Sequence, residues 1–161
     1  MLTQAKLKQL LHYDHETGVF TWRQSRGRIK AGDIAQSKGK YGHRTVKING
    51  KNMQLHRLAW LYMYGKFPDN MIDHINGISW DNRIVNLRDV TNTINQQNQK
   101  KAHVNSKSGL IGASWNRQNK AWKAQITHNG KCLYLGLYHT AQLAHDAYLK
   151  AKRELHVGCT I

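Results

Sequence analysis

The stretch IDHINGISWDNRIVNLRDVTNTIN, residues 72–95, is rich in Asp, His and Asn, and it decides how the rest of the chain is interpreted. A short apolar run ends at Asp73 and His74, a polar loop follows, and a second apolar run precedes residues that favour a helix cap. We therefore predict an α+β unit in which side chains from strand ends and a helix converge on one site. The predicted elements are a strand over 71–74, a loop over 75–86, a strand over 87–90, and a helix capped by Thr91 or Asn92 that runs to about residue 100.

Basic residues lie on both sides of this stretch. Lys and Arg outnumber Asp and Glu by 13 to 4 in residues 1–70 and by 9 to 2 in residues 101–161, whereas residues 71–100 hold 3 of each kind. The formal net charge of the whole chain is +16. Clustered Lys and Arg gain free energy by displacing counterions from phosphates, so a nucleic acid is the expected partner. A basic protein attracted to acidic surfaces in general is the less favoured alternative.

The composition excludes several classes of protein. A chain of 161 residues can bury one ordinary core or two small ones, and 40% hydrophobic residues argue against general disorder. Cys132 and Cys159 provide neither a disulfide framework nor a Cys-x-x-Cys metal motif. No run of about 18 apolar residues indicates a membrane span, and no signal peptide is recognised. We expect a cytoplasmic protein that does not insert into membranes.

The first part of the chain predicts a short helix followed by a basic loop. Residues 3–12 have the apolar spacing of an amphipathic helix, with Thr3 as a possible N-cap. A strand-like run at 19–22 leads into the loop that contains Arg26 and Arg28. This loop either follows DNA phosphates or is simply a solvated loop, and the sequence leaves both interpretations open.

A β-hairpin and an apolar helix are expected next. Asn49-Gly50 is typical of a type I′ turn, and it joins two strand-like runs on which Lys47 faces outward, where it can contact DNA. The run at 56–64 is apolar nearly all round and predicts a buried helix. We favour a local hydrogen-bonding role for His56, at the start of this helix, over a role as a metal ligand.

The residues of 72–95 suit the hydrolysis of a phosphodiester bond. This reaction needs a water nucleophile, a base and a cation that offsets charge on the phosphate and the leaving oxygen. The Asp73 carboxylate and the Asn95 carbonyl are hard oxygen donors of the kind that Mg²⁺ or Mn²⁺ prefers. His74, with an ordinary pKa of about 6.5, is the natural general base. Asn82 and Asn86 can brace the loop and orient His74.

Three other interpretations compete with this one. A calcium loop that starts at Asp73 would need a bidentate Glu at its twelfth position, where the chain has Ile84. A tetrahedral zinc site lacks cysteine ligands in this segment. An Asn-rich turn region without any chemistry remains open on composition alone.

Residues 56–98 resemble the His-Asn-His (HNH) endonucleases, specifically the phage-encoded homing-type members, whose motif is close to HRL..W…IDHINGD..DNR..NLR..T…N. The opening LLHYDHETGVFTWR also resembles the N-terminal region of such proteins. The resemblance implies a ββα-metal (His-Me finger) nuclease fold with His74 as general base, Asp73 and Asn95 as ligands of Mg²⁺ (or Mn²⁺), and Asn82 as the middle Asn. The family's last ligand is often His, and Asn95 at this position favours magnesium over zinc. Ile78 stands where Asp is frequent, which we interpret as neutral.

The C-terminal part predicts a second small fold. Residues 101–108 are polar and basic and read as a linker. Three strand-like runs follow, and Thr140 caps a predicted helix that ends at about Leu155. Alternation along the middle run turns Trp122 toward the helix, and we assign Trp115 and Trp122 to the core rather than to base stacking. The predicted strands are 111–115, 121–127 and 131–138.

Residues 109–161 resemble the Apetala2-type DNA-binding domain, in which a three-stranded antiparallel sheet packs on one helix and enters the major groove. The motifs that carry the resemblance are GASW, WKAQI, YLGLY and TAQLAHDAY. Plant members place several Arg on the groove-facing side, and this chain has shorter polar residues there, so a target sequence cannot be transferred. The resemblance makes Ser114, Asn116, Gln125, Thr127 and Tyr134 groove-facing, and makes Arg117, Lys123 and Lys131 contacts to phosphates or bases.

The sequence thus predicts a two-part α+β protein. Residues 1–100 form an HNH nuclease domain with an N-terminal basic region and a ββα-metal core at about 71–100, residues 101–108 a linker, and residues 109–161 an Apetala2-like domain. The expected activity is metal-dependent cleavage of double-stranded DNA, in the host-cell cytoplasm if a phage encodes the protein. A non-catalytic, sequence-specific DNA-binding regulator is the main alternative, and an RNA-binding or nucleoid-packaging protein is a weaker one. Whether the protein is a monomer or a homodimer stays open.

Overall fold

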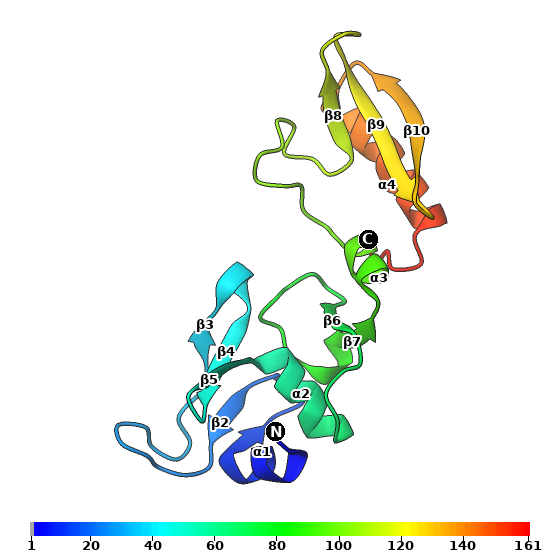
Figure 1. Cartoon of the computed structure of the whole chain (residues 1–161). Helices are drawn as coiled ribbons and strands as arrows, with labels where there is room; N and C mark the ends of the chain where they lie inside the picture. The colour runs from blue at the N-terminus through cyan, green and yellow to red at the C-terminus, as the bar shows by residue number, and fades with distance from the viewer. Residues whose placement is uncertain (1) are drawn as a thin grey trace. The chain divides into compact units, whose positions relative to one another are not determined.

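The computed structural model describes residues 2–161, and these form two compact units (Figure 1). Unit 1 ends at Asn92, and unit 2 is Thr93–Ile161. The division lies before the predicted linker, residues 101–108. Gln97 and Asn98 hydrogen-bond to the C-terminal segment, so the end of α3 belongs with unit 2.

Unit 1 begins with a helix that is shorter than predicted. Helix α1 spans Gln4–Leu10, and the Thr3 side chain caps it by accepting a hydrogen bond from the backbone N–H of Lys6 at 3.2 Å. The chain then leaves the helix and forms strand β1, Leu11–Tyr13, which pairs antiparallel with β2, Phe20–Trp22. Leu11 and Tyr13 are buried while the residue between them is exposed, so the alternation of a strand prevails over the helical spacing.

The predicted hairpin is confirmed. Strands β4, Arg44–Ile48, and β5, Lys51–Gln54, are antiparallel, and β3, Ser37–Lys38, adds a third strand in the order β3-β4-β5. The turn residues Asn49 and Gly50 have φ of 48° and 78°, as a type I′ turn requires. A one-turn 3₁₀ helix, η1, at Lys40–Gly42 precedes β4, and helix α2 at Leu55–Tyr64 follows the hairpin.

The central stretch forms two paired strands and the start of a helix. Strands β6, Met71–His74, and β7, Leu87–Val90, have the predicted bounds and pair antiparallel. A one-turn 3₁₀ helix, η2, at Ile84–Asn86 leads into β7, and helix α3 at Asn92–Gln97 is shorter than expected.

A single hydrophobic core holds unit 1 together. Leu7 from α1, Phe20 from β2 and Leu58 from α2 are at most 1% exposed. Burying a large apolar side chain of this kind stabilises a fold by about 1.5–3 kcal/mol. The same cluster includes Ile72 of β6 and Leu87 of β7, so the strands that carry the polar stretch are anchored in the core.

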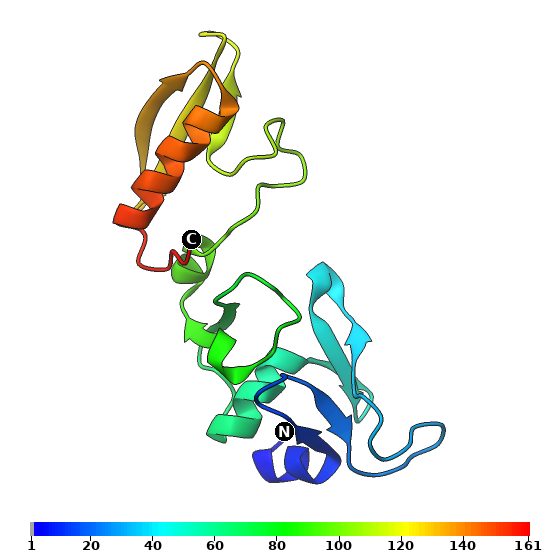
Figure 2. The same ribbon diagram turned by 180° about the vertical axis from the view of Figure 1, so that it is seen from behind.

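Unit 2 is a three-stranded antiparallel sheet with one helix packed on it, as predicted (Figure 2). Its core is small, because Ala113, Ala124 and Ala144 are the buried residues at the contact between sheet and helix. The sheet order is β10-β9-β8, with β8 at Ala113–Asn116, β9 at Ala121–His128, β10 at Lys131–Tyr138 and helix α4 at Ala141–Leu155.

The assignment of Trp115 to the core was wrong. Trp115 lies opposite Trp122 in the register of β8 and β9, and their rings pack edge to face with centroids 5.2 Å apart. It therefore faces the same side of the sheet as Trp122, as the alternation indicated. Its side chain is nevertheless 42% exposed, and Trp122 alone of the two packs on the Ala124 cluster. The hydrophobic core of unit 2 does not extend far enough along the sheet to cover the end of β8.

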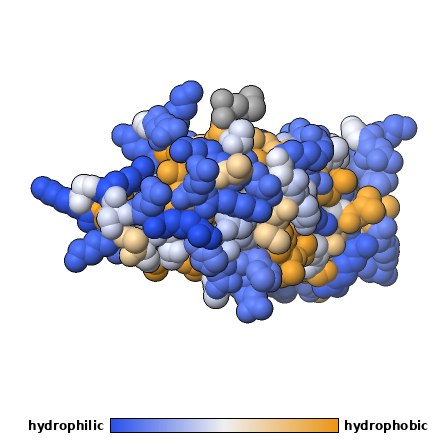
Figure 3. All heavy atoms as spheres, turned by 90° about the horizontal axis from the view of Figure 1, so that it is seen from below, coloured by the Kyte–Doolittle hydropathy of each residue, from blue (hydrophilic) through white to orange (hydrophobic). Residues whose placement is uncertain are grey.

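The face seen in Figure 3 is largely hydrophilic, with small hydrophobic areas scattered among charged and polar side chains. Within residues 2–161, none of the helices has the length and hydrophobicity that a membrane crossing requires.

Gly112 provides a test of the packing of unit 2. It has φ of +78°, and a Cβ at this position would overlap the ring of Tyr148. We expect Gly112→Ala to lower the free energy of unfolding by at least about 2 kcal/mol, from backbone strain and steric overlap together. Gly130→Ala is the matched control, because Gly130 has a similar φ of +75° and nothing within 4 Å of the added carbon. Chemical denaturation of both variants measures the difference, and equal losses would contradict the packing of Tyr148 on Gly112.

Candidate active site and nucleic-acid interface

His74 ends strand β6 at the entrance to the polar loop. It is 6% exposed and pairs with Leu87 in the register of β6 and β7. The ladder continues through a hydrogen bond from Ile75 N–H to Asn86 C=O at 2.9 Å, and a turn follows in which Gly77 N–H donates to His74 C=O at 2.8 Å. The chain therefore turns directly after the strand and fixes the backbone of His74 from both sides.

Asn82 connects His74 to the N-terminal part of unit 1. Its Oδ1 lies 3.3 Å from Nε2 of His74, and its backbone carbonyl accepts a hydrogen bond from the Tyr13 hydroxyl at 2.6 Å. An amide oxygen only accepts, so this contact places the imidazole hydrogen on Nε2 and makes Nδ1 the basic nitrogen. Asn82 is 2% exposed, and burial by the surrounding side chains holds this arrangement in place.

The surroundings of His74 favour its neutral form. Burial is the main cause that lowers its pKa below the ordinary 6.5, and the nearby His43 acts in the same direction. The hydrogen bond with Asn82 opposes this shift and does not overcome it. At neutral pH His74 is therefore uncharged and can accept a proton.

Side-chain amides brace the loop over 75–86. Asn86 Oδ1 accepts from Asn76 N–H at 2.9 Å, and its Nδ2 donates to the backbone carbonyl of Asp81 at 2.8 Å. The Asn76 side chain donates to the Asp81 carboxylate at 2.7 Å, and Arg83 donates to the same carboxylate at 2.6 and 2.8 Å. These bonds link the two ends of the loop, so Asn86 braces it as the sequence predicted for Asn82 and Asn86 together.

Asp73 forms an ion pair within the sheet. It lies opposite Arg88 in the register, and its Oδ2 accepts from Nε and Nη2 of Arg88, both at 2.8 Å. Asp73 is 5% exposed, and a buried carboxylate needs such a partner to offset the loss of hydration. Carboxylate oxygens are the ligands that Mg²⁺ and Mn²⁺ prefer. Asp73 therefore fits the role of a hard oxygen ligand.

Asn95, the second predicted metal ligand, belongs to unit 2. It lies in α3, whose C-terminal end is fastened to the last residues of the chain. Gly158 N–H donates to Gln97 Oε1 at 3.0 Å, and the Thr160 hydroxyl donates to Asn98 Oδ1 at 2.5 Å. The candidate ligands Asp73 and Asn95 are thus on different compact units.

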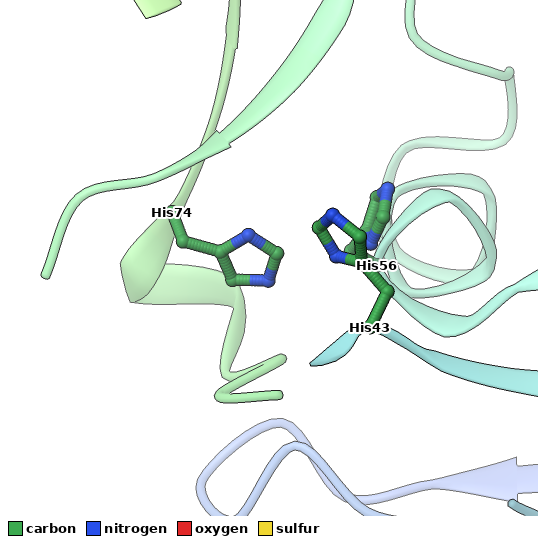
Figure 4. Close-up of side chains that lie close together, drawn as sticks. All are labelled: His43, His56 and His74. Carbon is green, nitrogen blue, oxygen red and sulfur yellow. The ribbon is translucent and has the colours of Figure 1, made fainter. Parts of the chain in front are cut away.

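A group of three histidines in unit 1 was not found by sequence analysis. His43 directly precedes β4, His56 is the second residue of α2, and His74 ends β6; Figure 4 shows the ring of His74 pointing toward the other two. The expected local hydrogen bond of His56 is not seen at its Nδ1, which is buried without a hydrogen-bond partner among the described residues. Burial and the neighbouring His74 and His43 lower the pKa of His56 to about 3. The three histidines are 13 and 18 positions apart in sequence, so no regular spacing indicates their contact.

Two of the predicted DNA-contacting cations of unit 1, Arg26 and Lys47, are joined by a hydrogen bond. The Arg26 guanidinium stacks 3.7 Å from the centroid of the Trp22 ring and donates to the backbone carbonyl of Lys47 at 3.2 Å. Arg28 and Lys47 are exposed. The stacking orders the Arg26 side chain on the loop while the region keeps a positive surface.

In unit 2, the face of the sheet opposite α4 carries most of the predicted contacts. Gln125 and Tyr134 are cross-strand partners, as are Ser114 and Lys123, and Thr127 continues the same face. Ser114, Gln125, Thr127 and Tyr134 are exposed, and Asn116 and Lys123 are partly buried. Arg117 is exposed just after β8. The register pairs Lys131 with His128, on the side that faces α4, so Lys131 differs from the rest of the set.

Comparison with known proteins finds that the polar stretch is similar to a nuclease family. Residues 53–97 match the family model described as HNH endonuclease. The chain is also 34% identical to Protein 3.8 of Escherichia phage T7 over 77 residues, which is 47% of this chain and 63% of that protein. The chain thus matches less than two thirds of the length of this relative. No solved structure matches the chain significantly. The HNH match covers His56, Asp73, His74, Asn82 and Asn95 and crosses the division between the units.

Asp81 provides a test of the loop brace. Its hydrogen bonds with Arg83 lower its pKa from 3.8 to about 2, so the folded state favours the charged carboxylate. We expect Asp81→Asn to lower the stability of the protein by about 1 kcal/mol at neutral pH. Because the folded pKa is below the ordinary value, this difference is present above pH 3.8 and disappears as the pH falls toward about 2.

Denaturation of wild type and variant across this pH range measures the effect. Asp69→Asn is the control, because the Lys66–Asp69 pair is highly exposed and contributes little to stability. A difference between wild type and Asp81→Asn that stays constant down to pH 2 would contradict the role of the charge.

Proposed function

We propose that the protein is a metal-dependent endonuclease that hydrolyses phosphodiester bonds in double-stranded DNA, of the phage homing type. The observation that carries this proposal is the contact of His74 with Asn82 inside the segment that matches the HNH endonuclease family. A buried, neutral imidazole held in one tautomer by a side chain that is itself fixed is suited to general base catalysis. The +16 net charge supports DNA as the substrate.

In the proposed mechanism His74 removes a proton from the attacking water. Asn82 keeps the hydrogen on Nε2, so that Nδ1 accepts the proton of the water. Tyr13 holds the backbone of Asn82 through its hydroxyl, and burial raises the pKa of Tyr13 above its ordinary value, so the hydroxyl remains a donor. His74 is the catalytic residue, and Asn82 and Tyr13 are positioning residues.

The proposed cofactor is Mg²⁺ (or Mn²⁺), held by the Asp73 carboxylate with Asn95 as a second oxygen donor. When bound, the cation would offset negative charge on the phosphate and on the leaving oxygen. Arg88 orients the Asp73 carboxylate through its two hydrogen bonds to Oδ2. The assignment of Asn95 rests on the resemblance and on the chemistry of its amide oxygen.

The proposed DNA contacts divide into two sets. Arg26, Arg28 and Lys47 of unit 1 would bind phosphates, where they add affinity without reading sequence. The exposed polar face of the sheet in unit 2 would read base edges in the major groove, as in an Apetala2-type domain. The residues proposed on this face are Ser114, Asn116, Lys123, Gln125, Thr127 and Tyr134. Arg117, just after β8, and Lys131, on the side that faces α4, would contact phosphates or bases from outside this face.

Removal of the base tests the catalytic role of His74. We expect His74→Ala to reduce nicking of plasmid DNA in Mg²⁺ by at least about 100-fold, because general base catalysis typically contributes that much. Binding of DNA in a gel shift should change little. His12→Ala, at an exposed histidine of the same unit, is the control. Cleavage by His74→Ala at the wild-type rate would refute the assignment.

Removal of the Tyr13 hydroxyl tests the positioning of Asn82. Tyr13→Phe leaves the buried carbonyl of Asn82 without its donor, so we expect kcat to fall about 10-fold with little change in KM. Tyr41→Phe is the control, because Tyr41 is 91% exposed. A rise in KM with constant kcat would instead indicate a role of Tyr13 in DNA binding.

The Asp73–Arg88 ion pair favours one alternative function. A carboxylate already neutralised by Arg88 has less need of a cation, as in a DNA-binding regulator that keeps the fold without catalysis. Treatment with EDTA distinguishes the two functions. Chelation stops cleavage by a metal-dependent nuclease and leaves the gel shift of a non-catalytic regulator unchanged, and a regulator would also leave plasmid DNA intact in Mg²⁺.

A further inference from the structure

The three-histidine cluster, His43, His56 and His74, has a donor set that differs from the proposed magnesium ligands. Each residue presents a ring nitrogen, and these three nitrogens lie within 4.8 Å of one another. Imidazole nitrogen suits Zn²⁺, Cu²⁺ and Ni²⁺, whereas Mg²⁺ and Mn²⁺ prefer carboxylate, carbonyl and water oxygens. The cluster and Asp73 therefore select different cations.

The spacing of the three rings is close to that of a metal site. In a tetrahedral site with metal–nitrogen distances near 2.0–2.1 Å, the centroids of two bound imidazoles lie about 5.2 Å apart. The centroids here are 4.9 Å apart for His43 and His56, 5.2 Å for His56 and His74, and 5.7 Å for His43 and His74. The Nδ1 atoms of His43 and His56 hold no hydrogen bond among the described residues, so rotation about the final torsion of these two side chains can turn their nitrogens toward an ion beside His74.

The burial of the cluster points to a ligand as well. His56 and His74 are 5% and 6% exposed, and the Nδ1 atoms of His43 and His56 are buried without hydrogen-bond partners among the described residues. A buried polar atom that lacks a partner destabilises the fold, because it has lost its hydration without gaining a hydrogen bond. Coordination would satisfy such a nitrogen, and neutral imidazole is the form that binds a metal.

We propose that the three-histidine cluster binds a transition-metal cation of the Zn²⁺ type and that the bound ion inhibits the enzyme by occupying the basic nitrogen of His74. Three histidines leave the fourth position of a tetrahedral ion to water. Binding of the ion does not depend on the proposed function. The inhibition rests on the proposed function, because inhibition requires His74 to be the catalytic base. Zn²⁺ and Mg²⁺ would then have opposite effects on DNA cleavage.

Binding is tested first, without any measurement of activity. The chelator-treated protein is titrated with Zn²⁺ by calorimetry, and with Co²⁺ by visible absorption, which reports tetrahedral coordination. We expect one Zn²⁺ per chain with a tetrahedral Co²⁺ spectrum, and at least 10-fold weaker binding in His43→Ala and in His56→Ala. His12→Ala controls for scattered binding, because the chain has 10 histidines. Thermal denaturation shows whether each variant is folded, and His43→Gln replaces His43→Ala if that variant is not.

Zn²⁺ should also raise the melting temperature of wild type and of His12→Ala by more than that of His43→Ala, since a ligand stabilises the state that binds it. Equal affinities in wild type, His43→Ala and His56→Ala would overturn the site.

Inhibition is tested by plasmid nicking in Mg²⁺ with increasing Zn²⁺, and each variant is compared with itself in the absence of Zn²⁺. We expect wild type and His12→Ala to lose activity at one equivalent of Zn²⁺, and His43→Ala to need at least 10-fold more. Tight Zn²⁺ binding to the cluster without inhibition, or with Zn²⁺ supporting cleavage, would overturn the inhibitory role. A protein that binds Zn²⁺ at the cluster and never cuts DNA would overturn the proposed nuclease function and leave the metal site intact.

Discussion

The hydrogen bond from the Tyr13 hydroxyl to the Asn82 carbonyl is the interaction on which the candidate site depends. It joins the first hairpin of the chain to the loop over 75–86, and the Asn82 side chain extends the connection to His74. Gly18 lies so close to the backbone of Asn82 and Arg83 that a Cβ would overlap them. The N-terminal hairpin is thus a support for the loop, and the orientation of the candidate base depends on residues about 60 positions away from it.

Elements with strong local signals were predicted accurately from the sequence. Asn49-Gly50 predicted the turn of the hairpin, because a type I′ turn requires positive φ at both central residues and Asn and Gly tolerate it. Thr140 marked the start of α4, where its side chain accepts from Leu143 N–H at 3.2 Å. The bounds of β6 and β7 followed from short apolar runs next to Asn-rich turns. In each case the information lies within a few residues of the feature that it determines.

Features that depend on distant contacts were missed. His43 has no sequence pattern that links it to His56 or His74, because three separate elements bring the rings together. The exposure of Trp115 depends on how far the core of unit 2 extends along β8, which alternation does not show. The length of α3 and the division after Asn92 depend on hydrogen bonds to residues 158–160 at the opposite end of unit 2. The alternation of apolar and polar residues predicts the face of the sheet to which a side chain points. Tertiary contacts determine whether other residues cover that face.

The hydrogen bonds between the end of α3 and the C-terminal segment limit how the two units of the chain can be recombined with those of other proteins. Lys100 and Lys152 add two more hydrogen bonds, to the backbone carbonyls of Thr160 and Gln99, and Lys152 is fully buried. A chimaera joined within residues 101–108 would keep the whole segment that matches the HNH model. It would, however, separate α3 from the native C-terminal residues that hydrogen-bond to it. Exchange of unit 2 would therefore succeed more readily if the segment over 93–100 were transferred with its own C-terminal residues, so that Asn95 is inherited together with the sheet of unit 2.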